Sequence, residues 1–233
     1  MGRFLWPTRR RVVTGAVDVT TFLLFSSAVL VLLASPGPNM AFILAHGIAF
    51  GPRGGVAAAA GIGCADLVMT LLTVLGVTAA IATWPPSFDV LRYAGTAYLL
   101  YIAFKALKPT DKSIGDASAP EGSVLKVFAK AMGGSLVNPK PLLFFMVFLP
   151  QFVNPQRGSV AGQLLVLGLT LAVLAFVFHA ILGLCAGHLG RNAPLFLQRY
   201  PQLAMLQRWG LAATMTVLAA YLFFTERPLT GKP

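Results

Sequence analysis

The chain has 233 residues, of which 57% are hydrophobic and only 11% are charged. This composition excludes a water-soluble globule, because so few polar residues could not cover its surface. The net charge of +11 does not indicate nucleic-acid binding, since Lys and Arg gather in the loops between apolar segments and form no basic stripe interleaved with aromatic residues. The composition therefore predicts a protein that lies in the lipid bilayer and has no nucleic-acid partner.

Apolar segments recur along the whole chain, and a helix that crosses a bilayer needs about 20 apolar residues. Six such segments are found, at residues 19–50, 54–83, 91–107, 127–153, 161–189 and 211–224. The segments leave no room for a soluble domain. We expect an all-α membrane protein with six transmembrane helices, built as one domain over residues 17–233.

The chain carries an internal repeat. Pro36 and Pro139 lie 103 positions apart, and Pro52 and Pro155 keep the same offset. The expected layout is repeat one at residues 17–107, a polar linker at 108–123 and repeat two at 124–226. Because repeat one holds three spans, repeat two enters the membrane from the opposite side, so the two three-helix repeats are inverted.

Residues 1–16 form an N-terminal extension that is either native or a mis-assigned start. Arg9, Arg10 and Arg11 before an apolar stretch resemble a cleaved signal peptide, but cleavage near Ser35 would remove half of the first repeat, which favours retention. Without residues 1–16, the loops after the first, third and fifth spans carry nine Lys and Arg residues and the other side carries four. This ratio favours a topology with both termini outside.

Two proline pairs interrupt the first and fourth spans at matching positions. Each proline lacks an N–H group and clashes with the carbonyl four residues earlier, so both helices should break there. A helix that restarts after a break points free N–H groups and a positive dipole end into the gap, which suits a carboxylate. Matched breaks in an inverted repeat indicate the binding site of a transporter rather than packing kinks. The candidate substrate-binding residues are Pro36, Gly37, Pro38, Asn39, Asn138, Pro139, Lys140 and Pro141.

Two charged residues stand inside apolar segments, where a charge marks a function or has a partner. Lys140 would hold a substrate carboxylate or extend to the membrane interface. Asp66 in the second span has three open roles: binding a substrate ammonium, carrying a coupling proton, or pairing with Lys140.

Other polar residues are weaker candidates. His179 in the fifth span would relay protons or join helices by a hydrogen bond, and Tyr98 and Tyr101 share a helix face that would line a pathway or belong to the core or the interfacial belt. Cys64 and Cys185 have no metal-ligand spacing, so we expect structural thiols, no metal and no cofactor.

Small residues spaced four apart would bring helices close together. Such faces occur at Ala57 and Gly61 and at Gly183 and Gly187. They would either join the two halves of the chain or form a homodimer.

Three ordered motifs resemble the signatures of the LysE/RhtB amino-acid exporters. They are Ser35-Pro36-Gly37-Pro38-Asn39-Met40, the stretch from Arg92 to Tyr101, and Ser135-Leu136-Val137-Asn138-Pro139-Lys140-Pro141. The resemblance covers nearly the whole chain from Val17. Pro141 departs from it, because many relatives have a small or polar residue at that position.

The resemblance implies secondary-active efflux of amino acids or close derivatives, such as homoserine, threonine or leucine, across a prokaryotic cytoplasmic membrane. Coupling to protons and alternating access around the two breaks are the implied mechanism. The alternatives are export of another small solute such as a metal cation, a membrane-embedded enzyme, or a thiol redox relay. An enzyme would need a nucleophile with a base or a metal cluster, and a relay would need cysteines beside the prolines, and the sequence has neither pattern.

Overall fold

The computed structural model describes residues 17–34, 37–84, 86–107, 123–190 and 201–224, and all regular elements within these ranges are helical. The elements are α1 (Val19–Ala34), α2 (Pro38–Thr83), α3 (Ser87–Leu107), α4 (Val124–Leu136), α5 (Pro139–Leu143), the π-helix η1 (Phe144–Phe148), the 3₁₀-helices η2 (Leu149–Phe152) and η3 (Pro155–Arg157), α6 (Val160–Leu189) and α8 (Pro201–Phe224). The predicted all-α class is confirmed. The N-terminal extension and residues 108–122 of the linker lie outside the described residues.

Two helices are long and apolar enough to cross a membrane, namely α2 and α6. Val124–Leu136 and Lys140–Phe152 form a pair bent by 51°, which adds a third span if the pair crosses as one unit. α1 is apolar but only 16 residues long. The described residues thus contain two or three candidate spans by length and composition, and the six-span inverted repeat remains a prediction.

Helix ends lie at both proline breaks. α1 ends at Ala34 and α2 begins at Pro38, while α4 ends at Leu136 and α5 begins at Pro139. Proline suits the first turn of a helix, where an N–H group has no partner within the helix, and it does not suit the interior. The same residue type therefore ends one helix and starts the next at each break.

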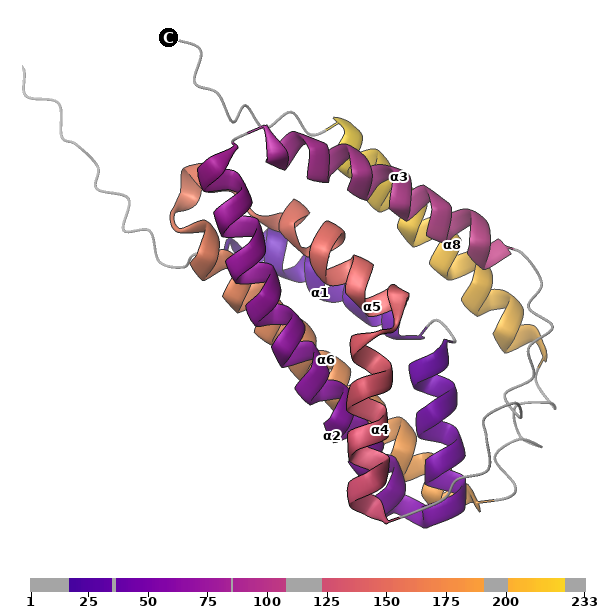
Figure 1. Cartoon of the computed structure of the whole chain (residues 1–233). Coiled ribbons are helices and arrows are strands. Elements are labelled where there is room, and N and C mark those ends of the chain that lie inside the picture. Colours follow the sequence, from indigo (N-terminus) through magenta and orange to yellow (C-terminus); the bar gives the residue numbers. More distant parts are fainter. Residues whose placement is uncertain (1–16, 35–36, 85, 108–122, 191–200, 225–233) are drawn as a thin grey trace, which may run out of the picture.

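α2 reverses direction at Gly51, as Figure 1 shows near the foot of the molecule. Gly51 has φ 68° and ψ −165°, a conformation that side chains disfavour and glycine adopts freely. Residues 38–50 and 52–83 are therefore two arms joined at a tight turn. This turn corresponds to the expected loop between the first two segments.

Glycines allow α2 and α6 to pack closely (Figure 1). A Cβ atom placed on Gly55 would lie 2.4 Å from the Gly183 carbonyl oxygen, and one placed on Gly187 would lie 2.3 Å from the Pro52 nitrogen. A Cβ atom placed on Gly61 would lie 2.3 Å from the Phe128 carbonyl oxygen of α4. These small-residue faces join the two halves within one chain, and the homodimer stays a prediction.

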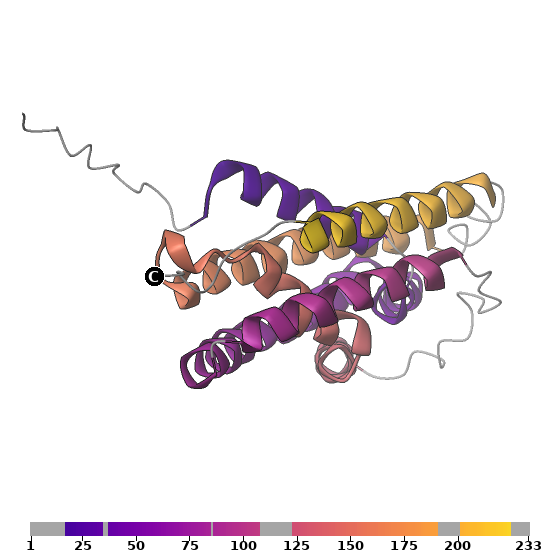
Figure 2. The ribbon, with the colours of Figure 1, turned by 90° about the horizontal axis from the view of Figure 1, so that it is seen from above.

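Aromatic side chains connect α1 to the helices that follow the second break. The Phe25 ring lies 6.3 Å from that of Phe148 and 5.1 Å from that of Phe152, measured between ring centroids. All three side chains are buried. On the outer side of this core, α3 and α8 lie side by side (Figures 1 and 2).

A polar contact fixes the start of α1. The Asp18 carboxylate accepts hydrogen bonds from Thr21 N at 2.9 Å and Thr21 Oγ1 at 2.8 Å, and it pairs with the Arg157 guanidinium in η3. The Thr21 N–H group, followed by the Thr21 hydroxyl and Arg157, holds the pKa of Asp18 below its usual value. The contact ties the first repeat to the loop that precedes α6.

Candidate functional site

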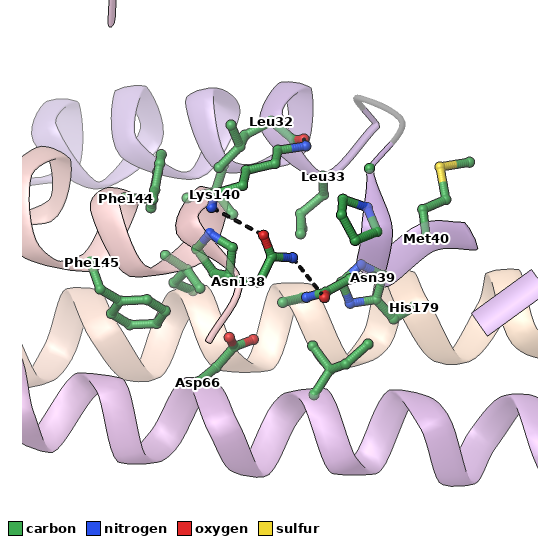
Figure 3. A pocket seen from close by; sticks show the side chains of 17 residues that line it. Leu32, Leu33, Asn39, Met40, Asp66, Asn138, Lys140, Phe144, Phe145 and His179 are labelled. Atoms are coloured by element: carbon green, nitrogen blue, oxygen red, sulfur yellow. Dashed lines mark hydrogen bonds between the residues drawn. The ribbon is translucent and has the colours of Figure 1, made fainter. Parts of the chain in front are cut away.

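A pocket lies where the two proline breaks meet the middle of α2 and α6 (Figure 3). Its polar lining comes from both halves of the chain, with Asn39 and Asp66 on α2, Asn138 and Lys140 at the second break, and His179 on α6. The apolar lining is Val29, Leu32, Leu33, Met40, Ile62, Phe144, Phe145, Leu171 and Ala175, together with Gly37, Pro38 and Pro141. The pocket thus combines a few polar groups with a largely aliphatic and aromatic wall.

Side-chain hydrogen bonds tie the two breaks together. Asn138 Nδ2 donates to Asn39 Oδ1 at 2.9 Å, and Asn39 Nδ2 donates to Ser135 Oγ at 3.0 Å (Figure 3 shows the first of these). Ser135 and Asn138 are buried. We call Ser135, Asn39 and Asn138 the amide bridge, because their side chains link the start of α2 to the region between α4 and α5.

Lys140 extends back toward the end of α1 (Figure 3). Its Nζ atom donates to the Leu32 carbonyl oxygen at 3.2 Å. Pro36, four residues after Leu32, has no N–H group to offer this carbonyl in a continued helix. The Lys140 ammonium of repeat two therefore donates to a carbonyl oxygen that has no helical N–H donor because of the break in repeat one.

The second break leaves fewer free N–H groups than the sequence suggests. Asn138 Oδ1 accepts the Lys140 N–H at 3.1 Å, and the Asn138 carbonyl accepts the Leu142 N–H at 3.3 Å. Pro139 and Pro141 have no N–H group. The N–H groups that were expected to face a carboxylate at this restarted helix are therefore bound to the protein's own acceptors, because Asn138 caps this helix start.

Asp66 is 3% exposed, and its carboxyl group points toward the pocket (Figure 3). Thr70 Oγ1 bonds the Asp66 backbone carbonyl at 2.8 Å. Within the described part of the chain, no residue donates a hydrogen bond to the Asp66 side chain. A buried carboxyl group without a donor is costly, which makes Asp66 a candidate for binding a ligand or a proton.

His179 also lines the pocket and is 5% exposed. Its Nδ1 atom is buried and has no hydrogen-bond partner among the described residues. The interhelical hydrogen bond expected as one role of this histidine is therefore not made through Nδ1. The group has the capacity to bind a ligand in the pocket.

The structure brings together most of the residues singled out from the sequence. Gly37, Pro38, Asn39, Asp66, Asn138, Lys140, Pro141 and His179 all line the pocket. Pro36 lies outside the described residues, and Pro139 contributes the first residue of α5. Tyr98 and Tyr101 stack on each other with ring centroids 6.3 Å apart on α3, and they do not line the pocket.

Sequence reasoning missed the Ser135 hydroxyl and the aromatic wall formed by Phe144 and Phe145. Ser135 belongs to the motif at the second break, so its place there was the available signal. The two phenylalanines gave no signal, because apolar residues are expected throughout a spanning segment.

Known proteins are similar to this chain over most of its length. The LysE type translocator family matches residues 30–226. A leucine efflux protein of Klebsiella pneumoniae subsp. pneumoniae is 37% identical over 172 residues, which cover 72% of this chain and 78% of the relative. Leucine efflux proteins of Salmonella choleraesuis and Salmonella typhimurium are 33% identical over the same shares. No solved structure matches the chain. The chain thus belongs to the LysE type translocator family and is a transporter, not an enzyme.

Proposed function

We propose that the protein exports amino acids or close derivatives through the pocket between the two proline breaks. The observation that carries this proposal is the placement of a buried carboxyl group, Asp66, in the same pocket as the Lys140 ammonium and the amide bridge. A zwitterionic amino acid needs an acceptor for its ammonium and donors for its carboxylate. The pocket offers both kinds of group.

The pocket wall favours an aliphatic side chain. Leu32, Ile62, Phe145 and Leu171 surround the polar groups with apolar surface. Burying a leucine-sized side chain against such a wall contributes about 1.5–3 kcal/mol. The names of the similar leucine efflux proteins point to the same substrate class.

The proposed architecture is six transmembrane helices arranged as two inverted repeats in the cytoplasmic membrane. α1 and residues 38–50 would form the broken first span, and α4 with the helices up to Phe152 would form the broken fourth span. The packing of α2 on α6 and of α3 on α8 supports this pairing of repeats, because each pair joins the same member of the two halves. Transport would then proceed by rocking of the halves around the pocket.

Protons are the proposed coupling ion, and Asp66 is the proposed carrier. Its carboxyl group is the acidic group that lines the pocket, and it is buried. Protonation would remove a negative charge from the pocket and change its affinity for a substrate ammonium. A proton or a substrate shifts the balance between inward-facing and outward-facing states only through such a difference in affinity.

The direct test is efflux from proteoliposomes loaded with labelled amino acids, with and without a proton gradient. We expect leucine and similar aliphatic amino acids to leave faster when the gradient is present, and lysine and glutamate to remain. Equal efflux with and without the gradient would contradict proton coupling alone. Retention of every amino acid tested would contradict the proposed substrate class and direct attention to another solute such as a metal cation.

A further inference from the structure

The polar groups in the pocket fall into two sets. The Asp66 carboxyl group and His179 Nδ1 have no hydrogen-bond partner among the described residues, although both side chains are buried. Lys140 Nζ and the amides of Asn39 and Asn138 are bound to other parts of the protein. The first set thus lacks partners, whereas the second set holds the two breaks together.

The groups of the first set are hydrogen-bond acceptors, which suit an ammonium group. Asp66 offers acceptor oxygens, and His179 Nδ1 is an acceptor in the tautomer that carries its proton on Nε2. An ammonium has three N–H donors, enough to serve both residues. Because unpartnered buried polar groups are costly, an ammonium gains affinity here without breaking any existing contact.

The second set contains donors that suit a carboxylate, but their present hydrogen bonds must first be released. A carboxylate is purely an acceptor, and the donors available beside the breaks are Lys140 Nζ and the two amide Nδ2 atoms. These donors now serve the Leu32 carbonyl, Ser135 Oγ and Asn39 Oδ1. A carboxylate makes stronger, charge-assisted hydrogen bonds than these neutral acceptors, so it competes for the donors.

We propose that the two ends of the substrate have different roles: the ammonium anchors at Asp66 and His179, and the carboxylate releases the amide bridge and the Lys140–Leu32 contact. This inference rests on the proposed function. Loss of these contacts frees α1 and the start of α2 from the second break, which the rocking of the halves requires. The substrate must therefore carry a carboxylate to be exported, although an amine is sufficient to bind.

The probes are leucine and 3-methylbutylamine, which has the same aliphatic group and ammonium but no carboxylate. The uncharged form of the amine crosses lipid without a carrier and would dissipate a proton gradient, so both assays use unlabelled amine and the same pH on the two sides of the membrane. The first assay measures competition between the amine and labelled leucine for binding to the protein in detergent. The second assay measures exchange: proteoliposomes are loaded with labelled leucine, and the efflux stimulated by leucine added outside is compared with the efflux stimulated by the amine. We expect the amine to compete with leucine for binding and to stimulate efflux at least about tenfold less than leucine.

A variant checks that the amide bridge causes this discrimination. Ser135→Ala removes the hydroxyl that accepts from Asn39, so the ratio of the efflux stimulated by leucine to the efflux stimulated by the amine should fall severalfold toward one. Ser27→Ala is the matched control, because the Ser27 hydroxyl bonds the Leu23 carbonyl of its own helix at 2.8 Å, outside the pocket. This control should keep the wild-type ratio.

Each remaining outcome contradicts a different statement. Equal stimulation of leucine efflux by the amine and by leucine, or an unchanged ratio in Ser135→Ala, would overturn the role of the carboxylate. Absence of competition between the amine and leucine for binding would overturn the anchor at Asp66 and His179. If leucine and all other amino acids stay inside the vesicles, the proposed function fails, and this inference fails with it.

Discussion

Asn39 holds the two proline breaks together through both ends of its amide group. Asn39→Leu has a similar size but leaves Asn138 Nδ2 and Ser135 Oγ without their partners. Because Asn138 and Ser135 are buried, we expect the free energy of unfolding to fall by about 1–3 kcal/mol. Denaturant unfolding in detergent measures the change.

Met40→Leu is the control for this substitution. Met40 is the next residue and also lines the pocket, but its side chain is apolar. The free energy of unfolding of Met40→Leu should therefore differ from that of wild type by less than about 1.5 kcal/mol. Equal losses in the two variants would show that shape at this position matters and that the amide bridge does not stabilise the fold.

Asp18 gives a pH-dependent contribution to stability. Its pKa lies below the usual value of 3.8 in the folded protein, so the contribution is complete above pH 3.8 and is lost as the pH falls through the folded-state pKa. Asp18→Asn should therefore be less stable than wild type at pH 7, by less than about 1 kcal/mol because the ion pair is exposed. Melting curves of both proteins should converge as the pH is lowered below 3.8, and a difference that persists there would contradict this assignment.

The sequence predicted most of the polar residues of the pocket, but it did not predict which residues they contact. The matched prolines marked Asn39, Asn138 and Lys140, and the rarity of acids in apolar segments marked Asp66. The contact of Lys140 with the Leu32 carbonyl joins residues 108 positions apart. No local spacing rule relates residues on different spans, so this contact required the three-dimensional structure.

The glycines of α2 and α6 set the distance between the two helices. Gly55→Ala would place a Cβ atom 2.4 Å from the Gly183 carbonyl oxygen, so the helices would have to separate. We expect a loss of about 1–3 kcal/mol, as for other overpacked interiors. Gly76→Ala on the same helix is the control, because nothing lies within 4 Å of its Cβ position and alanine favours a helix.

Thermal unfolding of the two variants in detergent gives the comparison. The expected order of melting temperature is Gly55→Ala below wild type, and Gly76→Ala equal to or above it. A Gly55→Ala variant as stable as wild type would show that the α2–α6 contact tolerates expansion.

Helix boundaries followed from the sequence where proline or glycine marks them. The breaks before Pro38 and Pro139 and the turn at Gly51 occur where those residues require them. The helical forms between Lys140 and Phe152 were not foreseen, because a span expected over residues 127–153 divides into α4, α5, η1 and η2. Apolar periodicity does not distinguish α, π and 3₁₀ hydrogen bonding, and the contacts of Phe148 and Phe152 with Phe25 join residues far apart in the sequence.

The proposed topology places the loop between the first two spans and the loop between the fourth and fifth spans on opposite sides of the membrane. The turn beside Arg53 and the loop that contains Gln156 lie at opposite ends of the molecule in Figure 1. Both residues are exposed. Single cysteines at these positions, Arg53→Cys and Gln156→Cys, should react with a membrane-impermeant maleimide from opposite sides.

The labelling uses a background in which Cys64 and Cys185, both free thiols, are replaced by serine. Intact inverted and right-side-out vesicles then report the side of each introduced cysteine. If both cysteines react from the same side, the inverted repeat is wrong, even if export itself is demonstrated.

We propose that Asp66 in the pocket couples substrate export to the proton gradient. Gradient-driven leucine efflux from proteoliposomes should be compared for wild type, Asp66→Asn and Asp89→Asn, since Asp89 is an exposed acid at the start of α3 and does not line the pocket. We predict that the gradient-driven efflux rate of Asp66→Asn is at least about tenfold lower than that of wild type, whereas Asp89→Asn keeps the wild-type rate. Gradient-driven efflux that survives unchanged in Asp66→Asn would contradict the coupling role of Asp66.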